Sequence, residues 1–135
     1  MQVFISHSVA GKDLARKVAE VLNASGFQAW DWSYDLFPGD NWGEELGRAL
    51  KSSEAMVVLL TSDFPQSPFV QSEISYALGQ LQYEGRVIPV IAAPPEELPP
   101  DKVPWILNRF HPINLLETGP EEGLQRIAQA LRQAA

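Results

Sequence analysis

Glu73, in the middle of the chain, follows a polar segment that comes directly after an apolar run. The segment TSDF covers residues 61–64, and Glu73 follows it near the start of a predicted helix. Phe69 lies one helical turn before Glu73, on the same face. These residue types at this spacing fit a functional carboxylate beside an aromatic wall. They also fit a solvated acid, mildly favoured near a helix N-terminus, beside a packing residue.

A second polar segment, Ser6, His7 and Ser8, ends the first apolar run. Serine and histidine together suggest a nucleophilic triad, but neighbours on a strand point to opposite faces, which argues against one. No metal site is predicted. His7 and His111 are the only histidines, neither has a second ligand at regular spacing, and the chain has no cysteine.

Two kinds of phosphate chemistry are disfavoured by the residues after the first apolar run. The sequence VAGKD, residues 9–13, has one glycine before Lys12 and an acid after it, unlike the glycine-rich run of a phosphate-binding loop. A phosphorylated receiver domain would need an acidic pair where this chain has Ser-His-Ser. Small ligands and protein partners remain.

The composition is that of an ordinary globular protein, with 45% hydrophobic and 20% charged residues. The length of 135 residues fits one domain, so we expect a single domain over residues 1–135. A net charge of −7 argues against direct binding of nucleic acid. No apolar run is long enough to cross a membrane, and the N-terminus lacks the basic and then apolar pattern of a secretory signal. Cysteine is absent. We therefore expect a cytoplasmic protein without a membrane partner.

Apolar runs with the character of strands alternate with helical segments along the whole chain. This alternation predicts an α/β fold, namely a flavodoxin-like five-stranded parallel sheet in the order 2-1-3-4-5 with helices on both faces. Pro89 suggests a position toward the sheet edge for the fourth strand. The predicted strands are QVFIS (2–6), FQAWDW (27–32), AMVVLL (55–60), RVIPVIA (86–92) and PINLL (112–116).

Capping signals mark the start of two predicted helices. Asn41 and Glu44 fit a capping box, and Ser67 followed by Pro68 fits an N-cap with proline at the first helical position. The helix that begins after Asn41 carries one apolar face, made of Trp42, Leu46, Ala49 and Leu50.

The predicted strand order also predicts where a ligand binds. The chain reverses direction between strands 1 and 3, and ligands bind outside the carboxyl ends of such strands. These ends are residues 6–8 and 61–64, with Glu73 one loop and little more than one helical turn beyond. Trp30, Trp32 and Trp42 fit either core or cavity wall, and we expect at least one of them in the core.

Three segments together carry a family resemblance. VFISHS (3–8) looks like a first strand that ends in serine followed by tyrosine or histidine, and SYDLFPGDNW (33–42) like a long loop with a Pro-Gly-Asp turn. SPFVQSE (67–73) has serine, an aromatic residue two positions on and glutamate four positions later. In this order the segments resemble the bacterial TIR (Toll/interleukin-1 receptor) domains that cleave NAD. Phe69 stands where tryptophan is commoner in the family, and Val70 where cysteine often follows.

The resemblance implies that NAD is the substrate, without a separate cofactor, and that Glu73 is the catalytic residue. The nicotinamide of NAD is a cation that departs neutral, so one carboxylate can stabilise the charge developing on the ribose without a general acid. The implied products are nicotinamide and ADP-ribose or a cyclic isomer, in bacterial anti-phage defence or signalling. Lys12 and Arg48 are the nearby cations for the pyrophosphate. The implied substrate-binding residues are Ser6, His7, Ser8, Asp31, Trp32, Ser67 and Phe69.

The resemblance also implies self-association through the loop after the second strand, which in enzymatic members often completes the site of a neighbouring subunit. A non-catalytic module for contacts between TIR domains is therefore the alternative to an enzyme. A sensor domain in a longer protein is a further implied partner. The candidate interface residues are Tyr34, Leu36, Phe37, Pro38, Gly39 and Asp40.

Overall fold

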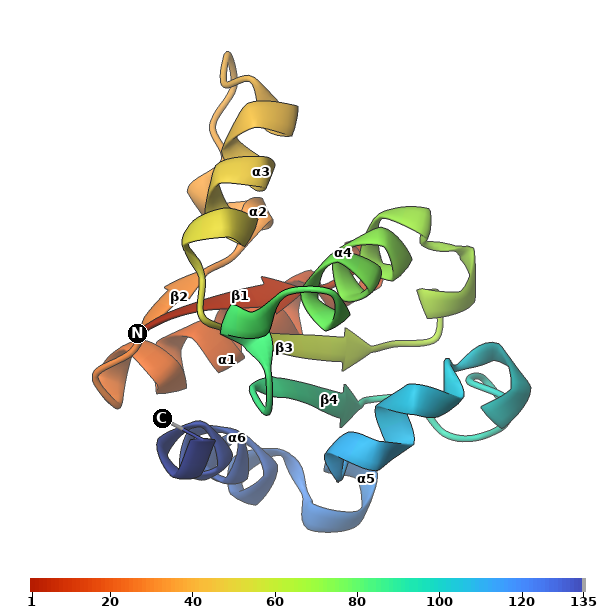
Figure 1. The fold of residues 1–135 in the computed structure, drawn as a ribbon. Coiled ribbons are helices and arrows are strands. Elements are labelled where there is room, and N and C mark those ends of the chain that lie inside the picture. Colours follow the sequence, from red (N-terminus) through yellow and green to blue (C-terminus); the bar gives the residue numbers. More distant parts are fainter. Residues whose placement is uncertain (135) are drawn as a thin grey trace.

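Five parallel strands form one sheet in the order β2-β1-β3-β4-β5 in the computed structural model, which describes residues 1–134 (Figure 1). Every neighbouring pair of strands is parallel, so the predicted fold class and strand order are confirmed. The strands are β1 (Gln2–Ser6), β2 (Gln28–Trp30), β3 (Ala55–Leu60), β4 (Val87–Ile91) and β5 (Ile113–Asn114).

Helices and short 3-10 turns fill the connections between the strands. Within the described residues, no helix combines the length and the apolar character needed to cross a membrane. The α-helices are α1 (Lys12–Ala24), α2 (Trp32–Asp35), α3 (Trp42–Ser52), α4 (Pro68–Leu78), α5 (Leu115–Thr118) and α6 (Pro120–Ala134). The 3-10 turns are η1 (Val9–Gly11), η2 (Phe64–Gln66), η3 (Leu81–Tyr83), η4 (Pro100–Lys102) and η5 (Trp105–Phe110).

Each face of the sheet has its own apolar core, because successive side chains of a strand point to opposite faces. On β3, Val57 and Leu59 join the core that α1 and α6 cover, whereas Met56 and Val58 join the core beneath α3 and α4. All six residues of β3 are buried, as expected for the central strand of a parallel sheet. The prediction of helices on both faces is confirmed, and Figure 1 shows the two layers.

The second strand is shorter than the sequence predicted, because Asp31 ends it. The side chain of Asp31 accepts a hydrogen bond from the backbone N–H of Ser33 and caps helix α2, so Trp32 belongs to that helix and not to β2. The turn from strand to helix places both residues at the carboxyl end of the neighbouring strand β1.

The capping predictions are borne out in part. The Asn41 side chain accepts a hydrogen bond of 3.2 Å from the Glu44 N–H at the start of α3. Ser67 stands at the N-cap of α4 and Pro68 is its first residue, but the Ser67 hydroxyl makes no capping bond. That hydroxyl is left free to face another partner.

Pro89 lies on β4, which is not an edge strand because β5 flanks it. Ala92 donates to the Leu60 carbonyl of β3, and donors alternate along a strand, so the Pro89 nitrogen faces away from β3. The short β5 pairs only with Val90 and Ile91. The proline therefore occupies the part of β4 that has no strand on its outer side, where a missing N–H costs no ladder bond.

Candidate active site

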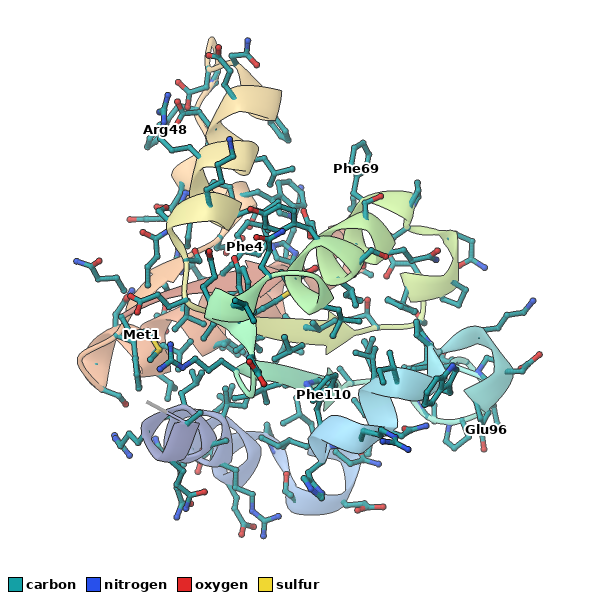
Figure 2. The ribbon with its side chains drawn as sticks, viewed as in Figure 1. Met1, Phe4, Arg48, Phe69, Glu96 and Phe110 are labelled. Atoms are coloured by element: carbon teal, nitrogen blue, oxygen red, sulfur yellow. The ribbon has the colours of Figure 1, made fainter. Side chains whose placement is uncertain are left out.

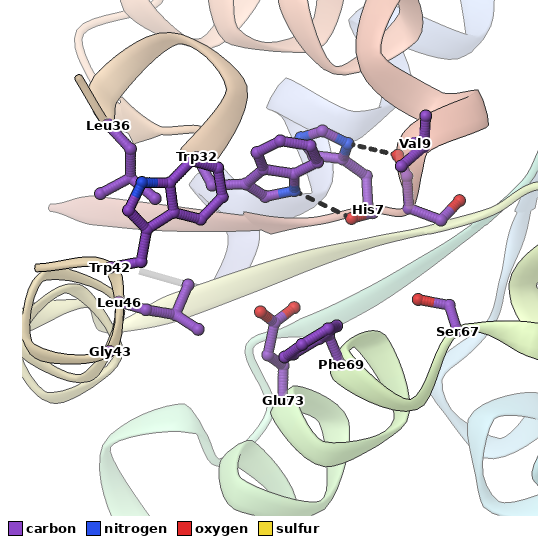
Figure 3. Close-up of a pocket in the computed structure, with 11 residues that line it drawn as sticks. His7, Val9, Trp32, Leu36, Trp42, Gly43, Leu46, Ser67, Phe69 and Glu73 are labelled. Atoms are coloured by element: carbon purple, nitrogen blue, oxygen red, sulfur yellow. Dashed lines mark hydrogen bonds between the residues drawn. The ribbon is translucent and has the colours of Figure 1, made fainter. Parts of the chain in front are cut away.

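A cavity of about 370 Å³ opens at the carboxyl end of β1, between α2, α3 and α4 (Figure 3). Each of these elements contributes side chains to its wall, and most of the contributions are apolar. The lining residues are His7, Ser8, Val9, Trp32, Leu36, Trp42, Gly43, Leu46, Ser67, Phe69 and Glu73.

Glu73 on α4 is the acid of this cavity, and it is only 5% exposed. The Ser6 hydroxyl donates a hydrogen bond of 2.7 Å to Glu73 Oε1. Burial raises the pKa of Glu73 from 4.5 to about 7, although the bond from Ser6 and the charge of His7 act in the opposite direction. The interpretation of Glu73 as a solvated acid is therefore wrong. Its protonation state changes near neutral pH.

His7 lies at the end of β1 and is tied to Asp31. Its Nε2 is 2.6 Å from Asp31 Oδ1, and its Nδ1 is 2.8 Å from the carbonyl oxygen of Ser8. Asp31 Oδ1 also accepts bonds from the backbone N–H and the hydroxyl of Ser33. Burial raises the pKa of Asp31, but the bonds from His7 and Ser33 outweigh it and leave the pKa below its ordinary value. Asp31 holds His7 from behind the wall and does not line the cavity.

Ser8 joins the ends of β1 and β3 through Asp63. The hydroxyls of Ser8 and Thr61 both donate to Asp63 Oδ1, the latter over 2.6 Å, and the Ala10 N–H donates to Oδ2 over 3.2 Å. Burial raises the pKa of Asp63, but the hydrogen bonds from these donors outweigh it. The pKa therefore lies below its ordinary value, and the carboxyl stays ionised. The carboxylate of Asp63 thus links the ends of β1 and β3, which the sequence predicted to lie side by side.

Three aromatic side chains form walls of the cavity. The Trp32 ring stacks on the His7 ring with centroids 4.9 Å apart, and its Nε1 donates to the His7 carbonyl. Trp42 is tilted against Trp32 at 5.8 Å. Phe69 is 73% exposed and points away from the core, as Figure 2 shows. Trp30 instead stacks on Phe4 and packs, partly buried, against the core, which meets the expectation of a core tryptophan in part.

The model of the TIR domain family matches residues 3–131. The chain belongs to this family.

Comparison with known proteins gives relatives of this TIR domain. The NAD(+) hydrolase PdTIR of Paracoccus denitrificans (strain Pd 1222) is 32% identical over 91 residues, which are 65% of this chain and 30% of that protein. This TIR domain thus corresponds to less than a third of the curated relative that it matches.

Two solved structures share the fold. The TIR domain of the Toll-related receptor TRR-2 from Hydra magnipapillata has a TM-score of 0.74 and 18% identity, over 98% of this chain and 96% of that one. The CMP N-glycosidase BcmB of Clostridium botulinum has a TM-score of 0.62 and 14% identity, over 96% of this chain and 98% of that one. At these identities the likeness concerns the fold alone.

The TIR domain brings most of the predicted substrate-binding residues to one place. Ser6 and Asp31 lie directly behind the wall and hold Glu73 and His7. Lys12 lies close by, with its Nζ 5.5 Å from the centroid of the Trp32 ring. Those that line the cavity itself are His7, Ser8, Trp32, Ser67 and Phe69, together with Glu73.

Some wall residues were missed or misassigned by sequence reasoning. Trp42, which by sequence fitted either core or cavity wall, is 55% exposed and lines the cavity. Leu46 on the same face and Leu36, assigned to the interface loop, also line the cavity. Arg48 pairs with Glu45 over 2.6 Å on the outer side of α3 and is not among the lining residues. Helical periodicity reveals an apolar face but does not tell a core from a cavity wall.

The loop after β2 divides its apolar residues between the cavity and the surface. Tyr34 and Phe37 are 61% and 62% exposed, and the Arg16 guanidinium lies 4.0 Å from the centroid of the Tyr34 ring. Asp40 accepts a bond from the Phe37 N–H and closes the turn that contains Gly39, whose φ is +95°. The loop is therefore an ordered structure with two aromatic rings on its outer side.

The buried acid predicts a stability effect that depends on pH. Because the pKa of Glu73 is about 7 in the folded chain and 4.5 ordinarily, the folded state binds more protons between these values. Wild-type stability therefore falls as pH rises from about 4.5 to 7. Glu73→Gln removes this loss, so at pH above 7 the variant should be more stable by on the order of 3 kcal/mol, and by much less in acid.

Urea unfolding of both proteins in acid and in mild base measures the difference. Glu96→Gln, at an exposed position in the loop after β4, is the matched control and should show no pH-dependent gain. A gain for Glu73→Gln that stays constant between the two conditions would contradict the assignment of a raised pKa.

Proposed function

We propose that this TIR domain cleaves the bond between nicotinamide and ribose in NAD, with Glu73 as the catalytic carboxylate. The observation that carries the proposal is the placement of one buried acid in a cavity with aromatic walls. The Ser6 hydroxyl fixes Oε1 of Glu73, and Glu73 lines the cavity. The name of the relative PdTIR, an NAD(+) hydrolase, supports the same activity.

The chemistry of NAD suits a single carboxylate. As the bond between C1′ of the ribose and the nicotinamide nitrogen breaks, its electron pair neutralises the pyridinium, and positive charge develops on the sugar. Glu73 stabilises that charge when it is ionised. Water then forms the new bond to C1′ and loses a proton, which gives ADP-ribose. Attack by an atom of the same substrate would give a cyclic isomer, and this route belongs to the proposal as its second product.

The walls suit the planar cationic ring of nicotinamide. Trp32, Trp42 and Phe69 offer aromatic faces, which attract cations and stack on flat rings. The cavity of about 370 Å³ is at the small end of the range for ligand sites, so the nicotinamide riboside half enters and the adenosine half extends beyond it. Lys12, whose Nζ lies 5.5 Å from the centroid of the Trp32 ring, is a cation on which the pyrophosphate could rest.

A second candidate function is an interaction module that acts through contacts between TIR domains. The exposed rings of Tyr34 and Phe37 favour it, because large apolar groups on an ordered loop mark interfaces. The two functions are compatible if the loop of one subunit covers the open cavity of another. A role in anti-phage defence or signalling belongs to this same proposal.

Glu73→Gln should reduce nicotinamide release by about two to three orders of magnitude, because it removes the charge and keeps the shape. Chromatography of the products after incubation with NAD measures the rate. The exposed Glu96→Gln is the control and should keep the wild-type rate. Wild-type turnover by Glu73→Gln would show that this carboxylate is not catalytic.

The rate of nicotinamide release should rise with pH through about 7, the pKa that burial gives Glu73, and level off above it. The ionised carboxylate is the active form, so acid suppresses the reaction. The measurement is kcat/KM across the pH range in which the protein stays folded, because kcat/KM reports the pKa values of the free enzyme. A rate that is flat or falls through this range would conflict with the assigned role of Glu73.

Phe37→Asp should weaken self-association and nicotinamide release together, because it places a charge on the outer side of the loop. Sedimentation and activity are followed over a wide dilution range. Leu81→Asp is the matched control, since Leu81 is 87% exposed on η3 and outside the loop. Activity per chain that does not change with dilution, and is equal in Phe37→Asp and wild type, would defeat the proposed contact.

A further inference from the structure

Both nitrogens of the His7 ring face groups that accept hydrogen bonds. Nδ1 is 2.8 Å from the Ser8 carbonyl oxygen, and Nε2 is 2.6 Å from Asp31 Oδ1. A neutral imidazole has one N–H and one lone pair, so it would turn a lone pair toward one of these oxygens. With Asp31 ionised, only the doubly protonated ring satisfies both contacts.

We propose that His7 is an imidazolium in the folded protein and a positioning residue for the cleavage reaction, one that fixes the Trp32 wall and favours the ionised form of Glu73. The positioning role of His7 in the cleavage reaction rests on the proposed function. The charge state of the ring is a property of the structure, and it can be measured without substrate.

The environment of Asp31 supports the charged pair. Its Oδ1 receives donors from His7 Nε2, from the Ser33 N–H and from the Ser33 hydroxyl. Three donors on one oxygen favour the carboxylate over the carboxylic acid, and the pKa of Asp31 is accordingly lowered even though burial raises it. Asp31 is 1% exposed, so the positive ring beside it is the partner that a buried anion requires.

The charge on the ring also explains how Trp32 is held. The two rings lie nearly parallel, at 13° and 4.9 Å between centroids, and Trp32 Nε1 donates over 3.0 Å to the His7 carbonyl. A cation over the face of tryptophan is attracted by the ring quadrupole. Figure 3 shows this pair above the Glu73 carboxylate. The imidazolium therefore sets the position of one cavity wall.

His7 supplies the positive charge that opposes the burial of Glu73. The ring does not serve as a general acid or base, because both of its nitrogens are engaged and its side chain is 0% exposed. The walls that α3 contributes near Glu73 are apolar. The other titratable groups packed around the pair are Lys12 on α1, Asp31 before α2, Asp63 after β3 and Tyr83 on η3.

The first test is the nitrogen NMR spectrum of the histidine rings at neutral pH. The chain has two histidines, so in the His111→Asn variant all histidine signals come from His7. Asparagine suits this position, because His111 has a φ of 55° and is exposed. We expect both His7 nitrogens to carry protons. The spectrum of a neutral tautomer would overturn the proposal.

The second test is the ionisation of Glu73, followed by carbon NMR of its carboxyl group. The double variant His7→Gln with Asp31→Asn keeps amide groups at both positions and removes both charges, so no buried anion is left alone. We expect the midpoint of Glu73 ionisation to move up by roughly one pH unit. The acid limb of nicotinamide release should move with it. An unchanged midpoint in the folded double variant would overturn the role assigned to the charge.

Asp31→Asn alone is the milder variant, because asparagine also caps a helix and leaves the ring without its anion. Without that anion the ring favours its neutral form, so the midpoint should move in the same direction. This variant replaces the double variant if that one does not fold. If wild type releases no nicotinamide, the proposed function fails while both NMR results stand. If nicotinamide is released and the midpoint does not move, this inference fails and the proposed function stands.

Discussion

The hydrogen bond from Ser6 to Glu73, 2.7 Å long, is the contact on which the site depends. It joins the end of β1 to helix α4, which follows β3, and so links the two strands where the chain reverses direction. A buried carboxylate that lost this donor would meet the full cost of desolvation. The position of the acid therefore depends on this bond, whereas Val70, Ile74 and Ala77 pack α4 on the sheet.

Three carboxylates lie around the ends of β1 and β3, and their surroundings move their pKa values in opposite directions. For Asp31 and Asp63, burial raises the pKa but several donors outweigh it, so both stay ionised. Among the described residues, Glu73 accepts a hydrogen bond from Ser6 alone, and burial raises its pKa to about 7. Two acids thus act as fixed anions that hold the backbone, and the third is the one able to change its charge at neutral pH.

The sequence allowed the strand order to be predicted because apolar runs and helical segments alternate, and this local property survives in the fold. It placed Glu73 at the site because the switch point of a parallel sheet follows from strand order. The roles of Asp31 and Trp42 could not be predicted in this way. Asp31 contacts His7, which lies 24 positions away in the sequence, and Trp42 lines a cavity that α2, α3 and α4 form together. Such contacts depend on tertiary packing and leave no periodic signal in the chain.

In the proposed reaction the walls and the acid act at different stages. The pyridinium is positive in the bound substrate and neutral when it leaves, so the attraction of Trp32 and Trp42 for a cation weakens as the bond breaks. The attraction of Glu73 grows over the same step, because the positive charge moves onto the sugar. Interactions that are stronger in the transition state than in the bound substrate are those that accelerate a reaction. In this proposal the aromatic walls act in ligand binding, and the rate rests on the charge of Glu73 and on the groups that favour its ionised form.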